Sequence, residues 1–288
     1  MKPAKFRYAR PSSIEEAYEL LERYGEDAQV LAGGQSLLAG LSMRLATPEV
    51  LVDIGSLNSL SGIALQGEEV VIGALTCHTA ALNSPVVQQY LPLFAEAISH
   101  IGHVGIRNRG TFGGSLAYVD PAAELPACVV AHGASVVVGS RHGGRRVEAE
   151  AFFTGLMQTA LRPGELIIEV RIPVQRAAQT HIFAELARRH GDFALVGIAG
   201  LVTLDGDSIS EAKLSYFGCV DQAAVARDTS AALVGRRLPL APALDLASLL
   251  GGDIRPADSP GMRAATKLEL AAVVTRRALN ASRMAASP

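Results

Sequence analysis

The sequence of 288 residues has no tryptophan and only three cysteines, and aromatic residues make up 5% of it. Cys77, Cys128 and Cys219 are far apart, and no two of them form a C-x-x-C pair. The chain therefore cannot supply four thiolates to an iron–sulfur cluster or a structural zinc. We expect the three thiols to be buried and inert.

Long apolar runs and blocks of like charge are also absent. No apolar run reaches the ~20 residues of a membrane helix, and the start of the chain lacks the apolar core of a signal peptide. Net charge is −2, with acids and bases interspersed, and the short basic cluster Arg141, His142, Arg145 and Arg146 predicts a solvated hairpin tip. We expect a cytoplasmic protein with no nucleic-acid partner and no membrane insertion.

The signatures of several enzyme classes are missing as well. There is no G-x-x-x-x-G-K-[ST] and no G-x-G-x-x-G between a strand and a helix, which disfavours P-loop and Rossmann folds. His100 and His103 would share a helix face, but Gly102 and Gly105 argue against that helix, so we do not expect a metal site there. Without a metal site or an obvious nucleophile, the sequence offers little for hydrolysis.

Two glycine-rich segments are the strongest positive signal. They read Ala32-Gly33-Gly34-Gln35-Ser36 and Thr111-Phe112-Gly113-Gly114-Ser115. A Gly-Gly step can adopt positive φ and let main-chain N–H groups converge on an anion, and a neighbouring hydroxyl adds a donor. One such step alone most often forms an ordinary turn. Two segments flanked alike by apolar residues predict paired nests for a diphosphate, and hence a bound dinucleotide.

Hydrophobic periodicity predicts a mixed chain with 49% hydrophobic residues, long enough for two or three subdomains. Predicted helices cover residues 12–25, 37–44, 76–82, 91–101, 125–132, 151–155 and 262–284. Predicted strands cover residues 29–32, 50–53, 63–65, 70–74, 136–138, 146–147, 165–173, 182–188, 193–204 and 209–218. Gly143-Gly144 predicts a hairpin turn, and Asp53 is expected to cap the turn after its strand. The polar stretch 174–180 marks a domain boundary.

Further motifs follow in a fixed order along almost the whole chain. They are Phe6-Arg7-Tyr8-Ala9-Arg10-Pro11, Arg44-Leu45-Ala46-Thr47-Pro48, Ile106-Arg107-Asn108-Arg109-Gly110, Pro121-Ala122-Ala123-Glu124-Leu125-Pro126 and Ala187-Arg188-Arg189-His190-Gly191-Asp192-Phe193-Ala194. With the glycine segments, they resemble the FAD-binding medium subunits of molybdenum-containing hydroxylases. That group includes carbon monoxide dehydrogenase, quinoline 2-oxidoreductase, nicotine and caffeine dehydrogenases and the flavin domain of xanthine dehydrogenase.

The resemblance implies an α+β protein. Its FAD-binding fold would be of the vanillyl-alcohol-oxidase (PCMH-like) type, in two subdomains at residues 1–55 and 56–174. A C-terminal flavoprotein domain at residues 175–288 would be α+β, with a three-stranded antiparallel sheet and packed helices.

The resemblance also implies where FAD binds. Both glycine segments would hold the pyrophosphate, Glu124 would bind sugar or adenine-side groups, Leu161 would contact the cofactor, and the ring of Phe193 would lie near the isoalloxazine. The implied FAD-binding residues are Leu31, Ala32, Gly33, Gly34, Gln35, Ser36, Leu37, Ile106, Asn108, Thr111, Gly113, Gly114, Ser115, Ala117, Glu124, Leu161 and Phe193. No residue is assigned a catalytic or metal-binding role.

Three positions depart from the family pattern. Gln35 stands where histidine is common, Glu124 where aspartate is more frequent, and Phe193 where tyrosine is usual. The first two keep hydrogen-bonding capacity, so we expect FAD binding to survive. Phe193 loses a hydroxyl, which either alters acceptor access or flavin potential or leaves a ring that serves only as packing surface.

The resemblance implies a subunit through which electrons leave a three-component molybdenum hydroxylase. A large subunit would carry the molybdenum cofactor, a small one two [2Fe-2S] clusters, and this chain FAD, in a dimer of heterotrimers acting on a small, N-heteroaromatic substrate. One alternative is a self-sufficient flavin oxidoreductase with Tyr118, Asp120 or His190 as acid or base; another is an assembly protein without cofactor, which the intact glycine segments disfavour. The acceptor stays open among a quinone, a cytochrome, oxygen and NAD.

Overall fold

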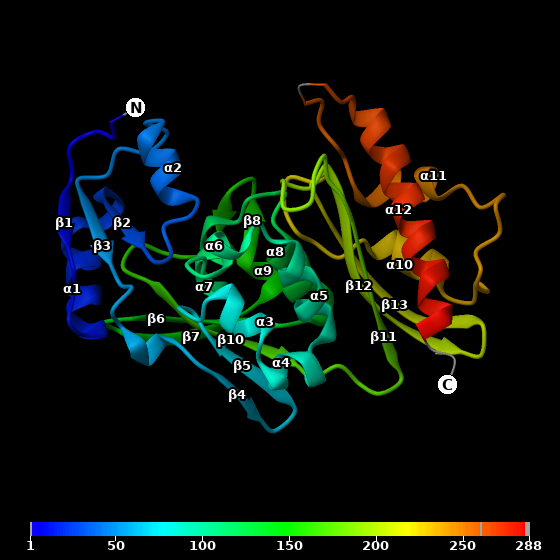
Figure 1. Cartoon of the computed structure of the whole chain (residues 1–288), viewed down its shortest axis with the longest axis horizontal. Helices are drawn as coiled ribbons and strands as arrows, with labels where there is room; N and C mark the ends of the chain where they lie inside the picture. Colours follow the sequence, from blue (N-terminus) through cyan, green and yellow to red (C-terminus); the bar gives the residue numbers. More distant parts are fainter. Residues whose placement is uncertain (1, 260, 286–288) are drawn as a thin grey trace.

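The computed structural model describes residues 2–259 and 261–285 and contains three larger sheets and a two-stranded one. The strands are β1 (Arg7–Ala9), β2 (Ala28–Leu31), β3 (Val50–Asp53), β4 (Ile63–Gln66), β5 (Glu69–Gly73), β6 (Ser135–Ser140), β7 (Gly143–Glu148), β8 (Phe153–Gly155), β9 (Gln158–Thr159), β10 (Leu166–Pro173), β11 (Gln179–Leu186), β12 (Val196–Asp205) and β13 (Ser208–Phe217). Figure 1 shows the three larger sheets following one another along the long axis.

Helices connect and cover these strands. They are α1 (Ile14–Tyr24), α2 (Leu37–Ser42), α3 (His78–Leu82), α4 (Pro85–Tyr90), α5 (Pro92–His100), α6 (Val104–Arg107), α7 (Phe112–Tyr118), α8 (Glu124–His132), α9 (Ala149–Phe152), α10 (Arg227–Leu233), α11 (Leu246–Asp253) and α12 (Ala264–Ala285). Two 3-10 turns, η1 (Gly25–Asp27) and η2 (Asn58–Leu60), complete the set in the part of the chain described. None of the described helices combines the length and apolar character that crossing a bilayer requires.

The first sheet is parallel, with strand order β1-β3-β2. Helix α1 crosses from β1 to β2 and begins at an N-cap, where the Ser13 hydroxyl accepts a hydrogen bond from the Glu16 amide at 3.2 Å. It buries Ala17 and Leu21 against Val50 and Val52 of the central strand. The end of β2 therefore delivers the first glycine segment to the edge of a rigid sheet.

The second sheet is antiparallel, with order β4-β5-β10-β6-β7. Helices α3 to α8 lie between β5 and β6 in sequence, so the second glycine segment belongs to a helical insertion above this sheet. Helix α8 is buried along its whole length and joins the largest apolar core. That core fixes α7 and α8 against the sheet.

The third sheet is antiparallel, in the order β11-β12-β13, and both of its faces are covered. Helix α8 packs on one face, and α12 packs on the other (Figure 1). Neighbouring residues alternate between the two cores: Ile198 and Tyr216 face the α12 side, whereas Ala199 and Phe217 face the α8 side. Apolar residues at successive positions therefore mark a strand buried on both faces.

The predicted α+β fold and most predicted elements are confirmed, and several details are wrong. Residues 151–155 do not form one helix, because α9 ends at Phe152 and β8 starts at Phe153. The β6–β7 turn lies at Arg141 and His142, since Ser140 pairs with Gly143. Gly143 and Gly144 belong to strand β7.

The basic cluster is only partly a hairpin tip. Arg141 and His142 lie at the turn and pair with Glu22, whereas Arg145 lies within β7 and binds both carboxylate oxygens of Glu165 at 2.8 and 2.7 Å. Arg146 also lies in β7, where it pairs with Glu69. The sequence did not predict strands β1, β8 and β9 or helices α4, α6, α7, α10 and α11.

Candidate functional site

The first glycine segment leaves β2 and turns into α2. Gly34 has φ +73°, the left-handed conformation that glycine adopts without cost. The side-chain nitrogen Nε2 of Gln35 donates to the Gly33 carbonyl at 3.1 Å and so stabilises the turn. Within the described part of the chain, the backbone N–H groups of residues 33–36 donate to no acceptor. Four consecutive amides are thus free to bind an anion.

The second glycine segment has a different backbone from the one predicted. Phe112, Gly113 and Gly114 form the first turn of α7, and neither glycine has positive φ. Its amides are already used: Phe112 N donates to Thr76 O at 2.9 Å, Gly113 N to Ala74 O at 2.8 Å and Gly114 N to Thr111 Oγ1 at 3.1 Å. The prediction of two matching nests is therefore wrong for this segment, whose amides serve the helix start and the adjoining loop.

The two segments nevertheless meet in space. A Cβ on Gly33 would lie 2.1 Å from the carbonyl oxygen of Arg109, and a Cβ on Gly114 would lie 4.0 Å from Cβ of Ala32. Gly113 likewise needs its hydrogen, because a Cβ there would lie 2.6 Å from Cβ of Ala74. Glycine is thus required for close approach of backbones, which brings chain positions 33 and 109 into one site.

Polar side chains of the second segment, and of Asn108 just before it, are held from behind by α3. Asn108 Oδ1 accepts from Thr79 Oγ1 at 2.6 Å, and Ser115 Oγ lies 3.2 Å from Nε2 of His78. Thr111 caps α7, and Ile106 packs against Gly102, where a Cβ would lie 2.8 Å from Ile106 Cδ1. Ala117 is exposed on α7. Asn108 and Ser115 therefore offer fixed polar groups beside the free amides.

Glu124 opens α8 and is buried, with 8% of its surface exposed. Burial, helped by the charges of Glu185 and Asp120, raises its pKa to about 8. Burial also raises the pKa of Glu185 to about 7, and Glu185 Oε2 lies 3.8 Å from Nδ1 of His100. At neutral pH Glu124 is thus largely protonated, so it can both donate and accept hydrogen bonds, as sugar hydroxyls require.

Exposed apolar side chains flank the glycine segments. Leu38 of α2 is 44% exposed and adjoins Gly34, Val104 starts α6 and is 61% exposed, and Phe193 is 69% exposed. The loop carrying Phe193 lies on the turn before α6, because a Cβ on Gly191 would lie 2.9 Å from Gly102 O. Apolar groups left open beside an anion site suit a ligand with a charged middle and a flat ring system.

Other predicted residues lie apart from this arrangement. Leu161 is half-buried after β9, and the described contacts do not join it to the glycine segments. Asp120 accepts from Ala122 N at 2.9 Å and Asp53 from Gly55 N at 2.9 Å, so both cap turns. His103 caps α6 through Nδ1. In the described residues no group of three or more His, Cys, Asp or Glu could hold a metal ion.

All three thiols were expected to be buried, and two of them are. Cys128 and Cys219 are buried, and burial raises the pKa of both, to about 12 for Cys219. Cys77 is only half-buried, immediately before α3.

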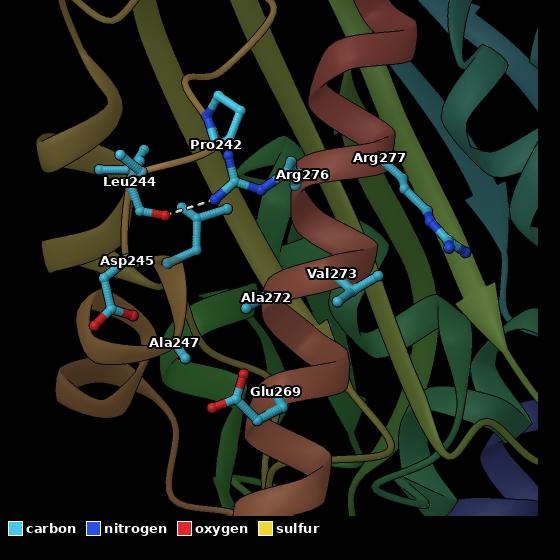
Figure 2. Close-up of a pocket in the computed structure, with 11 residues that line it drawn as sticks. Pro242, Leu244, Asp245, Ala247, Glu269, Ala272, Val273, Arg276 and Arg277 are labelled. Carbon is cyan, nitrogen blue, oxygen red and sulfur yellow. Dashed lines mark hydrogen bonds between the residues drawn. The ribbon is translucent and has the colours of Figure 1, made fainter.

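A separate open pocket of about 420 Å³ lies in the C-terminal part, between α12 and residues 242–247. Figure 2 shows Arg276 turned toward this loop, where it donates to the carbonyls of Ala241 at 2.6 Å and Leu244 at 2.5 Å, and Arg277 turned away. Asp245 and Glu269 line the pocket. With Arg276 engaged by backbone carbonyls, Arg277 turned away and two carboxylates present, the pocket does not suit a diphosphate.

Sequence reasoning missed His78 and Thr79, which support the site from beneath. The only sign of them in the sequence is a run of polar residues, Thr76 to Thr79, directly after a buried strand. Their role depends on a contact with residues about thirty positions away, because Thr79 and Asn108 are 29 residues apart. Periodicity reports local structure and carries no signal for such a contact.

Comparison with known proteins gives one consistent result. Residues 4–175 match the FAD binding domain in molybdopterin dehydrogenase, and residues 181–282 match the CO dehydrogenase flavoprotein C-terminal domain. Caffeine dehydrogenase subunit beta of Pseudomonas sp. (strain CBB1) is 35% identical over 97% of this chain and 95% of its own length.

Solved structures agree with these matches. Reconstituted CO dehydrogenase from Oligotropha carboxidovorans superposes with a TM-score of 0.93 at 35% identity over 99% of each chain. Quinoline 2-oxidoreductase from Pseudomonas putida 86 gives a TM-score of 0.90 at 32% identity, again over 99% of each chain. The likeness extends over both parts of the chain.

Proposed function

The chain belongs to the family of FAD-binding medium subunits of molybdenum hydroxylases, and from this premise we propose that it is the subunit through which electrons leave such an enzyme. It accepts electrons from [2Fe-2S] clusters of a partner subunit and passes them to an external acceptor. Bound FAD supplies the one- and two-electron redox chemistry that this exchange needs.

The observation that carries the proposal is the first glycine segment, which has four free amides and packs at Gly33 against the backbone of Arg109, two residues before the second segment. FAD has a diphosphate between two larger groups, and free main-chain amides suit its charge. Asn108 and Ser115 add side-chain donors, while Leu38, Val104 and Phe193 offer apolar surface to the ring system. The residues present thus fit the cofactor.

The remaining predicted FAD contacts stay part of the proposal. Glu124, neutral at pH 7, would hold a hydroxyl-rich part of FAD, and Phe193 would cover the isoalloxazine. Leu161 would contact the cofactor from beyond β9. We also retain the division into residues 1–55, 56–174 and 175–288, each of which contains one of the three larger sheets.

The partners we propose are a small subunit with two [2Fe-2S] clusters and a large subunit with the molybdenum cofactor, in a cytoplasmic dimer of heterotrimers. The three separate cysteines of this chain support placing the clusters elsewhere. A small N-heteroaromatic substrate is supported by similarity to proteins named for caffeine, nicotine and quinoline. Substrate choice then lies outside this chain.

The test is electron transfer in the complex carrying Gly33→Val, purified from the native host. The valine side chain would collide with Arg109 O and should empty the FAD site. We expect substrate still to bleach the iron–sulfur absorbance, while reoxidation by the acceptor slows at least about tenfold. Gly251→Ala is the control, because a Cβ there meets only Leu268 at 3.8 Å.

Unchanged reoxidation in a flavin-free Gly33→Val complex would contradict the electron-exit role. A yellow chain that purifies alone and oxidises a small molecule without other subunits would instead establish the self-sufficient flavin oxidoreductase. Tyr118, Asp120 or His190 would then be its acid or base.

A further inference from the structure

The start of α3 supports both ends of the second glycine segment and the residues just before it. The backbone amide of His78 donates to the Gly110 carbonyl at 2.9 Å, and the backbones of Cys77 and Thr111 form an isolated antiparallel β-bridge. The next two side chains of the same turn reach two different polar groups, since His78 lies against Ser115 and Thr79 against Asn108. The backbone and side chains of this short turn therefore fix Asn108 and Ser115, two of the residues implied in FAD binding.

His78 is built into this position. Its exposure is 2%, and its ring fills the space beside Gly110, where a Cβ would lie 2.8 Å from the ring Cδ2. Burial, with the charge of Arg107, lowers its pKa to about 4, so the ring is neutral at pH 7. Its Nδ1 is buried and has no hydrogen-bond partner.

The neutral ring has one N–H, and its position decides what Ser115 can do. If Nδ1 carried the proton, a buried N–H donor would be left without an acceptor, which is rare in folded proteins. If Nε2 carries it, the ring donates to Ser115 Oγ at 3.2 Å and only a lone pair on Nδ1 stays unpaired. The serine hydroxyl then keeps its own proton for another acceptor.

Thr79 has the same effect on Asn108. Its hydroxyl donates to Asn108 Oδ1 at 2.6 Å, so the amide oxygen is occupied and the NH₂ group is the side free to bind a ligand. Asn108 is exposed, so without Thr79 its side-chain amide could take several orientations. Fixing one of them when the ligand binds would then cost conformational entropy.

We propose that His78 and Thr79 are positioning residues that preset Ser115 and Asn108 as hydrogen-bond donors toward the FAD diphosphate. The proposal rests on the FAD site proposed above. Neither residue touches the cofactor; each sets the donor direction of the residue in front of it.

The test is FAD affinity of the deflavinated complex, measured by flavin fluorescence, for single and double variants. We expect His78→Leu and Ser115→Ala each to raise Kd about tenfold, as for loss of one hydrogen bond to a charged group. The double variant should bind no more weakly than Ser115→Ala alone, because His78 acts through Ser115. His78→Gln keeps an N–H donor and should retain most of the affinity.

Thr79→Val, which keeps the side-chain shape, should raise Kd several-fold, and Thr79→Ser should not. The matched control is His132→Leu. His132 is another buried neutral histidine with one unpaired ring nitrogen, but it contacts Pro173 instead. Its variant should leave Kd unchanged.

Additive effects of His78→Leu and Ser115→Ala, or a His78→Gln variant as weak as His78→Leu, would reduce His78 to packing and overturn the inference. If His78→Leu fails to fold, Thr79→Val and His78→Gln decide the question. Failure of the unmodified complex to bind FAD would contradict the proposed function itself, and so is distinct from either result.

Discussion

Gly33 is the residue on which the site's geometry depends most directly. Even the smallest side chain is excluded there, since a Cβ would lie 2.1 Å from Arg109 O and 2.8 Å from Arg109 C. The atoms that a Cβ would meet belong to the backbone of Arg109 and Gly110, so no flexible side chain can move aside to make room. The two glycine segments must separate to admit a methyl group, and the free amides move with them.

We therefore expect Gly33→Ala to weaken FAD binding more than tenfold and to destabilise the apo chain by about 1–3 kcal/mol, as overpacked sites do. Titration with FAD and urea unfolding measure the two effects. Gly251→Ala should leave FAD binding unchanged and be neutral or slightly stabilising, because it lies in helix α11. Equal FAD affinity in the two variants would mean that the contact with Arg109 does not shape the site.

Glu124 makes the stability of the folded chain depend on pH. Its unfolded carboxyl loses a proton near pH 4.5, whereas the folded one retains it to about pH 8. Between these values the folded state binds more protons, so stability falls as pH rises and levels off above pH 8. Glu185, with a pKa of about 7, acts in the same direction. The pKa values of His78 and His132, lowered to about 4 by burial, affect stability only below about pH 6.5.

The FAD-free chain should therefore lose stability between pH 6.5 and 8.5, by an amount on the order of 1–3 kcal/mol. Glu124→Gln removes the titrating group and should reduce this loss markedly. Thermal unfolding at a series of pH values measures both chains. A Glu124→Gln variant whose Tm falls as steeply as that of the unmodified chain would contradict the assignment of the proton to Glu124.

At the scale of elements, α12 is joined to the third sheet by a buried hydroxyl pair. Thr275 donates to the Ala271 carbonyl at 2.7 Å, so its oxygen accepts from the Tyr216 hydroxyl, also at 2.7 Å. Both side chains are buried. Removal of the two hydroxyls should therefore have unequal effects.

Thr275→Val leaves the Tyr216 hydroxyl buried without a partner and should cost about 1–3 kcal/mol. Tyr216→Phe leaves Thr275 still bonded to Ala271 and should cost about 1 kcal/mol or less. Urea unfolding, fitted with one m-value for both variants, compares their free energies of unfolding. A larger loss in Tyr216→Phe would mean that the hydroxyls are paired differently.

Elements with a long, clear period could be predicted from the sequence, and short ones could not. Helices α1 and α12 and strands β10 and β12 follow from apolar spacing. Residues 151–155 mislead because Phe152 and Phe153 give one short apolar run that fits a helix end and a strand start equally well. Strand β1 is mostly exposed and is defined by its pairing with β3 about forty residues later, as in Arg7 with Val50.

The site shows the same limit. The glycine segments could be found in the sequence, but that the second one has engaged amides could not, because their acceptors Ala74 and Thr76 lie far from residue 113 in the chain. The reason for glycine also differs from the one predicted at all positions except Gly34. Close approach between backbones, rather than positive φ, requires it at Gly33 and Gly113.

At the scale of the whole molecule, the second and third sheets share one core. Phe183 and Phe217 of the third sheet belong to the same apolar cluster as α8, and their rings stack at 5.8 Å between centroids. Residues on the two sides of the predicted boundary at 174–175 are therefore expected to unfold together.

Phe183→Ala should lower stability by about 3–5 kcal/mol and shift a single calorimetric transition for the second and third sheets together. Leu65→Ala is a suitable control, because Leu65 is 42% exposed on β4. Two transitions, with only the later residues responding to Phe183→Ala, would show that the shared core does not couple the sheets.

As an FAD-carrying subunit of a molybdenum hydroxylase, this chain should be isolated together with its partners. Cofactor and metal analysis of the complex that co-purifies with the tagged chain from its native host decides whether it is. We predict three subunits in equal amounts, with one FAD, one molybdenum and about four irons per copy of this chain, as two [2Fe-2S] clusters require. A chain that purifies without molybdenum and iron, or a complete complex without FAD, would contradict the account.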